Sequence, residues 1–199
     1  MTSNLAAALS AFAAGIVLQN VILARAFCTD DLLRSTRTYG AMLRMGYSTG
    51  VVTMISMLAA WCAHLLFNIL PTLSNWRWLI YFFCVILGTV IYHMLPGRFK
   101  MSAPIPGESL HLTYTAICSM AYGIVLITMA NYTSFLQALL YALGCCIGMV
   151  AAQMLIHAGH ERIGLSLVPK SFTGMPILLI YIGILSLAIY GLIGHQLPT

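Results

Sequence analysis

The chain has 199 residues, of which 61% are hydrophobic and 7% charged, and its mean hydropathy is +0.94. A soluble domain carries about 25% charged and about 45–50% apolar residues. On folding, a domain of this size buries only about two thirds of the surface that its unfolded chain exposes. Disordered chains are poor in apolar residues, and secreted disulfide scaffolds are shorter and richer in cysteine. The composition therefore predicts an integral membrane protein, a single domain over residues 1–199 with the lipid bilayer as its solvent.

Six apolar stretches are long enough to cross a hydrocarbon core of about 30 Å, because a helix rises about 1.5 Å per residue. Backbone polar groups in lipid must be satisfied within the segment, which favours helices. We therefore predict an all-α membrane protein with six transmembrane helices. The first ten residues lack a positively charged region, so we interpret the first stretch as a span, not a cleaved signal. The predicted spans are approximately residues 5–27, 39–67, 76–95, 110–130, 134–158 and 175–194.

The basic residues predict the orientation of the chain. The net charge is +5, and eight of the nine Lys and Arg residues fall at or after the ends of the odd-numbered spans, whereas Arg77 lies on the other side. The positive-inside rule then places the odd-numbered connectors in the cytoplasm and both termini outside. Because these charges lie between apolar stretches, we interpret them as topology signals and expect no nucleic-acid partner.

The two halves of the chain show a weak internal similarity. Residues 39–46 and 141–148, at the second span of each half, are both rich in small side chains, which let helices approach closely. Three spans in each half would insert a duplicated unit in opposite orientations. We therefore predict an inverted 3+3 repeat of the kind found in transport proteins, with repeat one at about 1–100, repeat two at about 101–199, and half-helices in spans one and four.

Two of the six cysteines occupy places that favour a functional role. Cys28 ends the first span, and Cys118 lies ten residues after Glu108, which is about 15 Å along a helix and near the bilayer midplane. Thiolates are the usual ligands of iron–sulfur clusters, but two cysteines supply only half a site, so the others would come from a partner. The adjacent Cys145 and Cys146 point about 100° apart on a helix, and we interpret them as packing residues.

Polar side chains at membrane depth offer a different interpretation. Asn20 lies in the first span and Asn131 near the end of the fourth. Buried polar groups in a bilayer mark either pathways or hydrogen bonds between helices. With His111, these two residues would line a small-molecule site in a six-span transporter or substrate-binding subunit without redox chemistry. A purely structural scaffold for partner subunits is a third hypothesis.

Several segments resemble the membrane subunits of the Rnf/Nqr complexes. The run V-P-K-S-F-T-G-M-P-I at 168–177 is similar to the family pattern V-P-x-x-F-x-G-x-P-I, and I-L-S-L-A-I-Y-G at 184–191 to its final helix, G-L-M-S-L-A-F-x-G. Residues 134–141 also resemble the family's fifth span, and residues 161–163 resemble the start of the loop after it. Q-N-V-I-L-A-R at 19–25 resembles N-N-F-V-L-V-K of the RnfA/NqrE branch, and the outward N-terminus agrees with that branch.

The resemblance implies a subunit of a redox-driven oxidoreductase that translocates Na⁺ or H⁺ across the bacterial cytoplasmic (inner) membrane and is not catalytic alone. It implies that Cys28 and Cys118 bind iron of a [2Fe–2S] cluster shared with a homologous six-span partner of opposite orientation. Subunits carrying flavin and iron–sulfur groups would be further partners. The cysteine motifs depart from those of the family. The spacing from Arg25 to Cys28 is two residues shorter than the corresponding family spacing. In the fourth span, the family cysteine aligns with Ser119, and Cys118 lies one residue earlier.

Overall fold

The computed structural model describes residues 2–18, 20, 39–69, 75–94, 110–132, 134–164, 169, 172 and 174–193. Every regular element within these residues is a helix, which confirms the all-α fold class. Five of the six spans begin within one residue of the predicted position. The elements are α1 (Thr2–Ala13), the π-helix η1 (Ala14–Leu18), α3 (Tyr39–Ile69), α4 (Arg77–Met94), α5 (Leu110–Asn131), α6 (Phe135–Gly164) and α7 (Met175–Ile193).

Three of the described helices have the length and composition of membrane spans, and three shorter ones are also apolar. Met45–Phe67, Arg77–Met94 and Phe135–Arg162 are long and apolar enough to cross a bilayer, and Ala6–Ile16, Ser119–Asn131 and Pro176–Gly191 form shorter apolar helices. Of the predicted first span, the structure describes residues 5–18 and Asn20, and residues 19 and 21–27 lie outside the described residues. The chain is therefore a six-span membrane protein, whereas the inverted repeat and its half-helices stay predictions.

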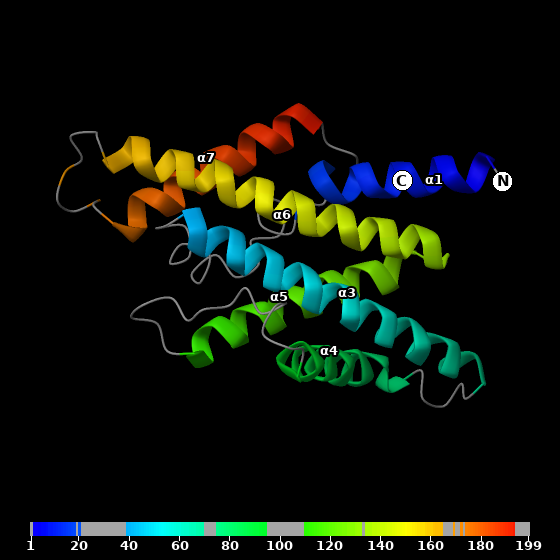
Figure 1. The fold of residues 1–199 in the computed structure, drawn as a ribbon. Helices are drawn as coiled ribbons and strands as arrows, with labels where there is room; N and C mark the ends of the chain where they lie inside the picture. Colours follow the sequence, from blue (N-terminus) through cyan, green and yellow to red (C-terminus); the bar gives the residue numbers. More distant parts are fainter. Residues whose placement is uncertain are drawn as a thin grey trace.

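The two long helices α3 and α6 form the centre of the molecule (Figure 1). α3 packs against α4, α5 and α6, whereas α1 and η1 pack against α6. The first helix of each half thus lies on the second helix of the other half. In α6, 56% of the most apolar stretch of the span is buried inside the protein, compared with 28% in α4. α6 is therefore a core helix, and the apolar side chains that α4 exposes suit contact with lipid.

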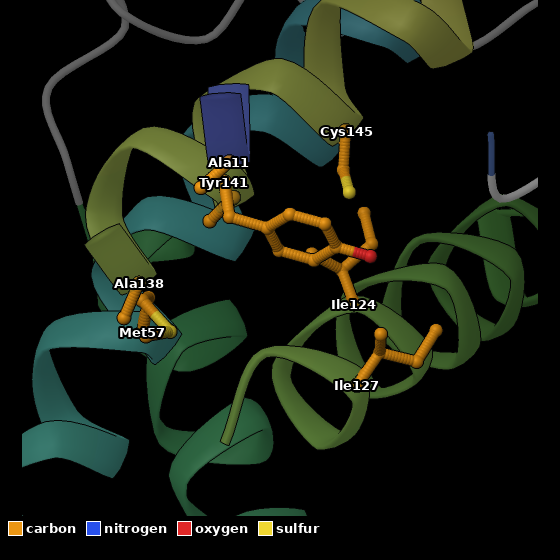
Figure 2. Close-up of a cluster of buried hydrophobic side chains, with 8 residues drawn as sticks. Ala11, Met57, Ile124, Ile127, Ala138, Tyr141 and Cys145 are labelled. Atoms are coloured by element: carbon orange, nitrogen blue, oxygen red, sulfur yellow. The ribbon is translucent and has the colours of Figure 1, made fainter. Parts of the chain in front are cut away.

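The centre of the bundle is a buried cluster contributed by four helices. Tyr141 of α6 is fully buried among Ala11 of α1, Met57 of α3 and Ile124 of α5. Figure 2 shows the Tyr141 ring extending from α6 toward Ile124, with Cys145 on the same helix beside it. A phenol ring packed by residues of four helices fixes their relative rotation, because cores of this density tolerate little change in volume.

The adjacent cysteines of α6 are packing residues, as predicted. Cys145 is fully buried in the Tyr141 cluster. Cys146 faces α3, where a Cβ placed on Gly50 would lie 3.9 Å from the Cys146 Cβ atom. The two thiols therefore belong to different helix interfaces.

Glycines allow α1 and η1 to approach the α6 backbone closely. A Cβ added to Gly148 would lie 2.6 Å from the carbonyl oxygen of Ile16, and one added to Gly15 would lie 2.7 Å from that of Tyr141. A Cβ on Gly144 would collide with the carbonyl of Phe12. Gly144 and Gly148 form a G-x-x-x-G pair, the small-residue motif of tightly crossing membrane helices. The close approach expected for residues 141–148 is thus confirmed.

A single methyl group should disrupt this crossing. Gly148→Ala places its Cβ against backbone that cannot rotate away, so we expect a loss of about 1–3 kcal/mol in unfolding free energy. Gly183→Ala is the matched control, because a Cβ there meets nothing within 4 Å. Thermal unfolding of the purified protein in detergent measures both. Equal unfolding temperatures for the two variants would contradict the close crossing.

Candidate functional site

The two predicted ligands lie at the edge of what the structure describes. Cys28 lies outside the described residues, and Cys118 belongs to α5 but its side chain lies outside them. The separation of the two thiols therefore stays a prediction. The structure does describe what supports them: Asn20, eight residues before Cys28, and the part of α5 that follows Cys118.

Asn20 connects the end of the first span to α6. Its side chain is 4% exposed, and its Nδ2 donates a hydrogen bond to the carbonyl oxygen of Gly148 at 2.7 Å. The same amide lies 3.3 Å from the carbonyl oxygen of Ile16. Gly148 has no side chain to shield its carbonyl, so the carboxamide can reach the α6 backbone. Of the two roles open to a polar residue at this depth, Asn20 makes a hydrogen bond between helices.

The α5 helix reaches the same level of α6. Met120 is fully buried in one cluster with Met149 and Ile156 of α6 and Met45 of α3. Met149 follows Gly148 directly, and Met120 lies two residues after Cys118. Met120 and Met149 thus belong to one buried cluster, and Asn20 bonds to Gly148, the residue before Met149.

Two of the three residues of the small-molecule hypothesis are described, and they contact different parts of the structure. Asn131 lies at the end of α5, is exposed, and donates to the carbonyl of Ile127 in its own helix at 2.9 Å. Asn20 contacts α6 at Gly148, well inside that helix. The His111 side chain lies outside the described residues.

Hydroxyl groups follow the buried face of α3. Thr49 donates to the carbonyl of Met45 at 2.8 Å, and Thr53 to that of Thr49 at 2.6 Å. The hydroxyls of Ser48 and Tyr92 are hydrogen-bonded at 2.9 Å and join α3 to α4. Thr49 and Thr53 thus bond to carbonyls of their own helix, which is the usual way to bury Ser and Thr in a span, whereas the buried Ser56 hydroxyl of α3 has no partner among the described residues.

Gln153 of α6 has two such buried polar atoms, and the sequence analysis did not predict this. The side chain is fully buried, and neither its Nε2 nor its Oε1 has a hydrogen-bond partner within the described part of the chain. A Cβ placed on Gly46 of α3 would lie 3.6 Å from this Oε1 atom. A carboxamide in an otherwise apolar span was the available signal, but its lack of partners depends on the packing of α3 on α6.

The described ranges contain no group of three His, Cys, Asp or Glu side chains that could hold a metal ion. At the predicted cytoplasmic end of α6, His157 Nε2 lies 3.9 Å from the exposed Glu161 carboxylate. The ring of His157 also lies 6.4 Å from that of Tyr39 of α3. These contacts join the start of α3 to the last turns of α6.

The described helices, with α1, α3 and α5 packed on the long helix α6, define a polytopic helical membrane protein. No family model matches the chain. It is 28% identical over 182 residues to the A-type subunit of the ion-translocating oxidoreductase complex of Syntrophotalea carbinolica, and the match covers 90% of this chain and 92% of that relative.

Two further relatives are named for the ion they move. The A-type subunit of the proton-translocating ferredoxin:NAD(+) oxidoreductase complex of Clostridium ljungdahlii is 27% identical over 197 residues, covering 96% of this chain and 98% of that one. The Na(+)-translocating counterpart of Acetobacterium woodii is 25% identical over 186 residues, covering 92% and 94%. The chain is therefore similar to A-type subunits of ion-translocating oxidoreductase complexes over about nine tenths of its length, which confirms that part of the predicted resemblance.

An unpaired buried amide should cost stability. Gln153→Met keeps the length of the side chain and removes both unpaired polar groups, so we expect the unfolding free energy to rise by about 1–3 kcal/mol. Thr128→Val is the control, because the Thr128 hydroxyl is bonded to the carbonyl of Ile124 at 2.6 Å. Thermal unfolding in detergent compares them. A lower unfolding temperature for Gln153→Met than for wild type would contradict the expectation.

Proposed function

We propose that the protein is the A-type membrane subunit of an Rnf-type electron-transport complex. In this role it helps carry electrons across the membrane through a [2Fe–2S] cluster shared with a homologous six-span partner. Electron flow is coupled to ion translocation. The observation that carries the proposal is the similarity to RnfA relatives over about nine tenths of both chains. These relatives are named for H⁺ in one case and Na⁺ in another, so the proposal covers either ion.

The residues present fit half of the site for such a cluster. Thiolates are its usual ligands, and Cys28 and Cys118 would each provide one, with two more from the partner. Ser119, which follows Cys118 directly, is exposed, and the next residue, Met120, is buried. Two thiolates in one chain suit a cluster whose other two ligands come from a second subunit.

The bound cluster would supply one-electron redox chemistry, and the chain's own residues would position and insulate it. Asn20 and Met120 support the two ligand segments against α6. The apolar spans exclude water, and no Asp or Glu lies in the middle of any span. The proton or ion route would therefore use neutral groups or another subunit, because this chain lacks a carboxylate relay.

The arrangement of the two halves supports the proposed inverted repeat. α1 packs on α6 of the other half, and α5 packs on α3. Related halves of opposite orientation would exchange their first helices in this way. In the proposed topology both termini lie outside the bacterial inner membrane. Electrons from a cytoplasmic flavin or iron–sulfur partner enter the subunit pair and leave toward a flavin-carrying subunit on the outer face.

Replacing either ligand should remove the cluster. In a purified complex of this chain with its partner subunits, we expect an electron paramagnetic resonance signal of a reduced [2Fe–2S] centre. Cys28→Ser and Cys118→Ser should each abolish it, because a half-site missing one thiolate cannot hold the iron. Cys62→Ser is the control, since Cys62 is free and exposed on α3. An unchanged signal in both ligand variants would refute the proposed cluster.

Fusions to alkaline phosphatase, which is active only outside the cytoplasm, test the proposed topology. A fusion after Thr199 should be active, whereas one after Arg162 should be inactive, because most basic residues lie on the cytoplasmic side. The fusion after Arg162 lies at the end of α6 and precedes α7. The reverse pattern of activities would overturn the assigned orientation.

A further inference from the structure

Polar side chains follow one face of α6 from its C-terminal end into the span. Glu161, His157 and Gln153 are spaced at intervals of four residues, so they lie on the same face of the helix. Exposure falls along this line, because the Glu161 side chain is 71% exposed, that of His157 is 18% exposed, and Gln153 is fully buried. The distance from Glu161 to Gln153 along the helix is about 12 Å. The line therefore begins at the surface and ends inside the bundle.

The Gln153 carboxamide ends this line among apolar side chains. Met149 and Ile156, about one turn away on α6 in either direction, are fully buried in one cluster with Met45 of α3. The Oε1 atom lies beside Gly46 of α3, where a Cβ would be 3.6 Å away, so this position offers it no side-chain donor. Neither Oε1 nor Nε2 has a hydrogen-bond partner among the residues that the structure describes. An amide in such surroundings has lost its hydration without compensation from the rest of the described fold.

The two ends of the carboxamide define what can bind there. Its oxygen accepts hydrogen bonds and its NH₂ group donates them, so a matching ligand must both donate and accept. Water does both, whereas a bare metal ion would satisfy only the oxygen. Because the Gln153 side chain is fully buried, a side chain of another subunit does not reach it. A buried water held by groups of this kind is a normal part of a protein interior.

We propose that Glu161, His157 and Gln153 form an entry path for water and protons, which leads from the cytoplasmic end of α6 in the proposed orientation to the Gln153 carboxamide. The inference rests on the proposed function, which needs an ion to enter although no Asp or Glu lies in the middle of a span. It assigns that role to water held by a neutral side chain.

The histidine is the proton-carrying step of this path. His157 Nε2 lies 3.9 Å from the Glu161 carboxylate, and the ring of Tyr39 from α3 lies 6.4 Å from the His157 ring. An imidazole can accept a proton on one nitrogen and release one from the other. A ring N–H bond breaks as an O–H bond forms on the water at Gln153, and the ring regains a proton from the Glu161 side. No electrons move in this step.

Radiolytic labelling tests for this water directly, because hydroxyl radicals formed from a water inside a protein oxidise methionines beside it. Met149 lies next to Gln153, whereas Met57 is equally buried but belongs to the Tyr141 cluster. In the wild-type complex with its partner subunits, we expect Met149 to be oxidised at least about fivefold faster than Met57, because the amide holds water there. Mass spectrometry of the two peptides measures both rates.

Two substitutions separate the amide from the space it fills. Gln153→Leu removes both polar groups and should lower the oxidation of Met149 to the rate of Met57. Gln153→Asn retains a carboxamide and should keep Met149 reactive. Equal oxidation of Met149 and Met57 in wild type would overturn the inference without any variant, and so would unchanged oxidation of Met149 in Gln153→Leu.

Ion uptake by the complex in proteoliposomes tests whether the path is used. We expect Gln153→Leu to move at least about twofold fewer ions per electron transferred than wild type, since water no longer reaches the span along this face. An unchanged ratio would overturn the role as an entry path. A wild-type complex that transfers no electrons would instead refute the proposed function, and methionine oxidation would still decide whether water reaches Gln153.

Discussion

The close contact of α1 and η1 with the backbone of α6 is the interaction on which the rest of the structure depends. Lipid is as apolar as a leucine side chain, so membrane helices associate through close packing and hydrogen bonds. Gly15, Gly144 and Gly148 bring the backbones together, and Asn20 adds a buried hydrogen bond at the same place. Without this contact the first span would have little reason to remain beside the second half of the chain.

This contact also joins the two halves into one body. Because α1 lies on α6 and α5 lies on α3, neither half packs separately. The buried Tyr141 cluster draws on both halves. Asn20 of the first half bonds to Gly148 of α6, and Met120 of α5 shares a buried cluster with Met149 of α6 and Met45 of α3.

Much of the fold was predictable because the bilayer simplifies the problem. Long apolar stretches must be helices in lipid, so hydropathy placed the start of α3, α5 and α7 at the observed residue. Small residues at 141–148 predicted a close approach but not that α1 would make it, because a G-x-x-x-G face does not encode its partner. Gln153 was not predicted as a buried polar residue, because the mean hydropathy of a span changes little when one residue is an amide. The cysteine pair was predicted mainly through a resemblance, and its thiols lie beyond the described side chains.

An electron cryo-microscopy map of the complex with its homologous partner tests the central claim most directly. The account predicts iron density at the boundary of the two subunits, within bonding distance of the sulfurs of Cys28 and Cys118, with Asn20 still bonded to Gly148. A map in which these two sulfurs lie farther apart than one cluster can bridge, with no metal between them, would contradict it.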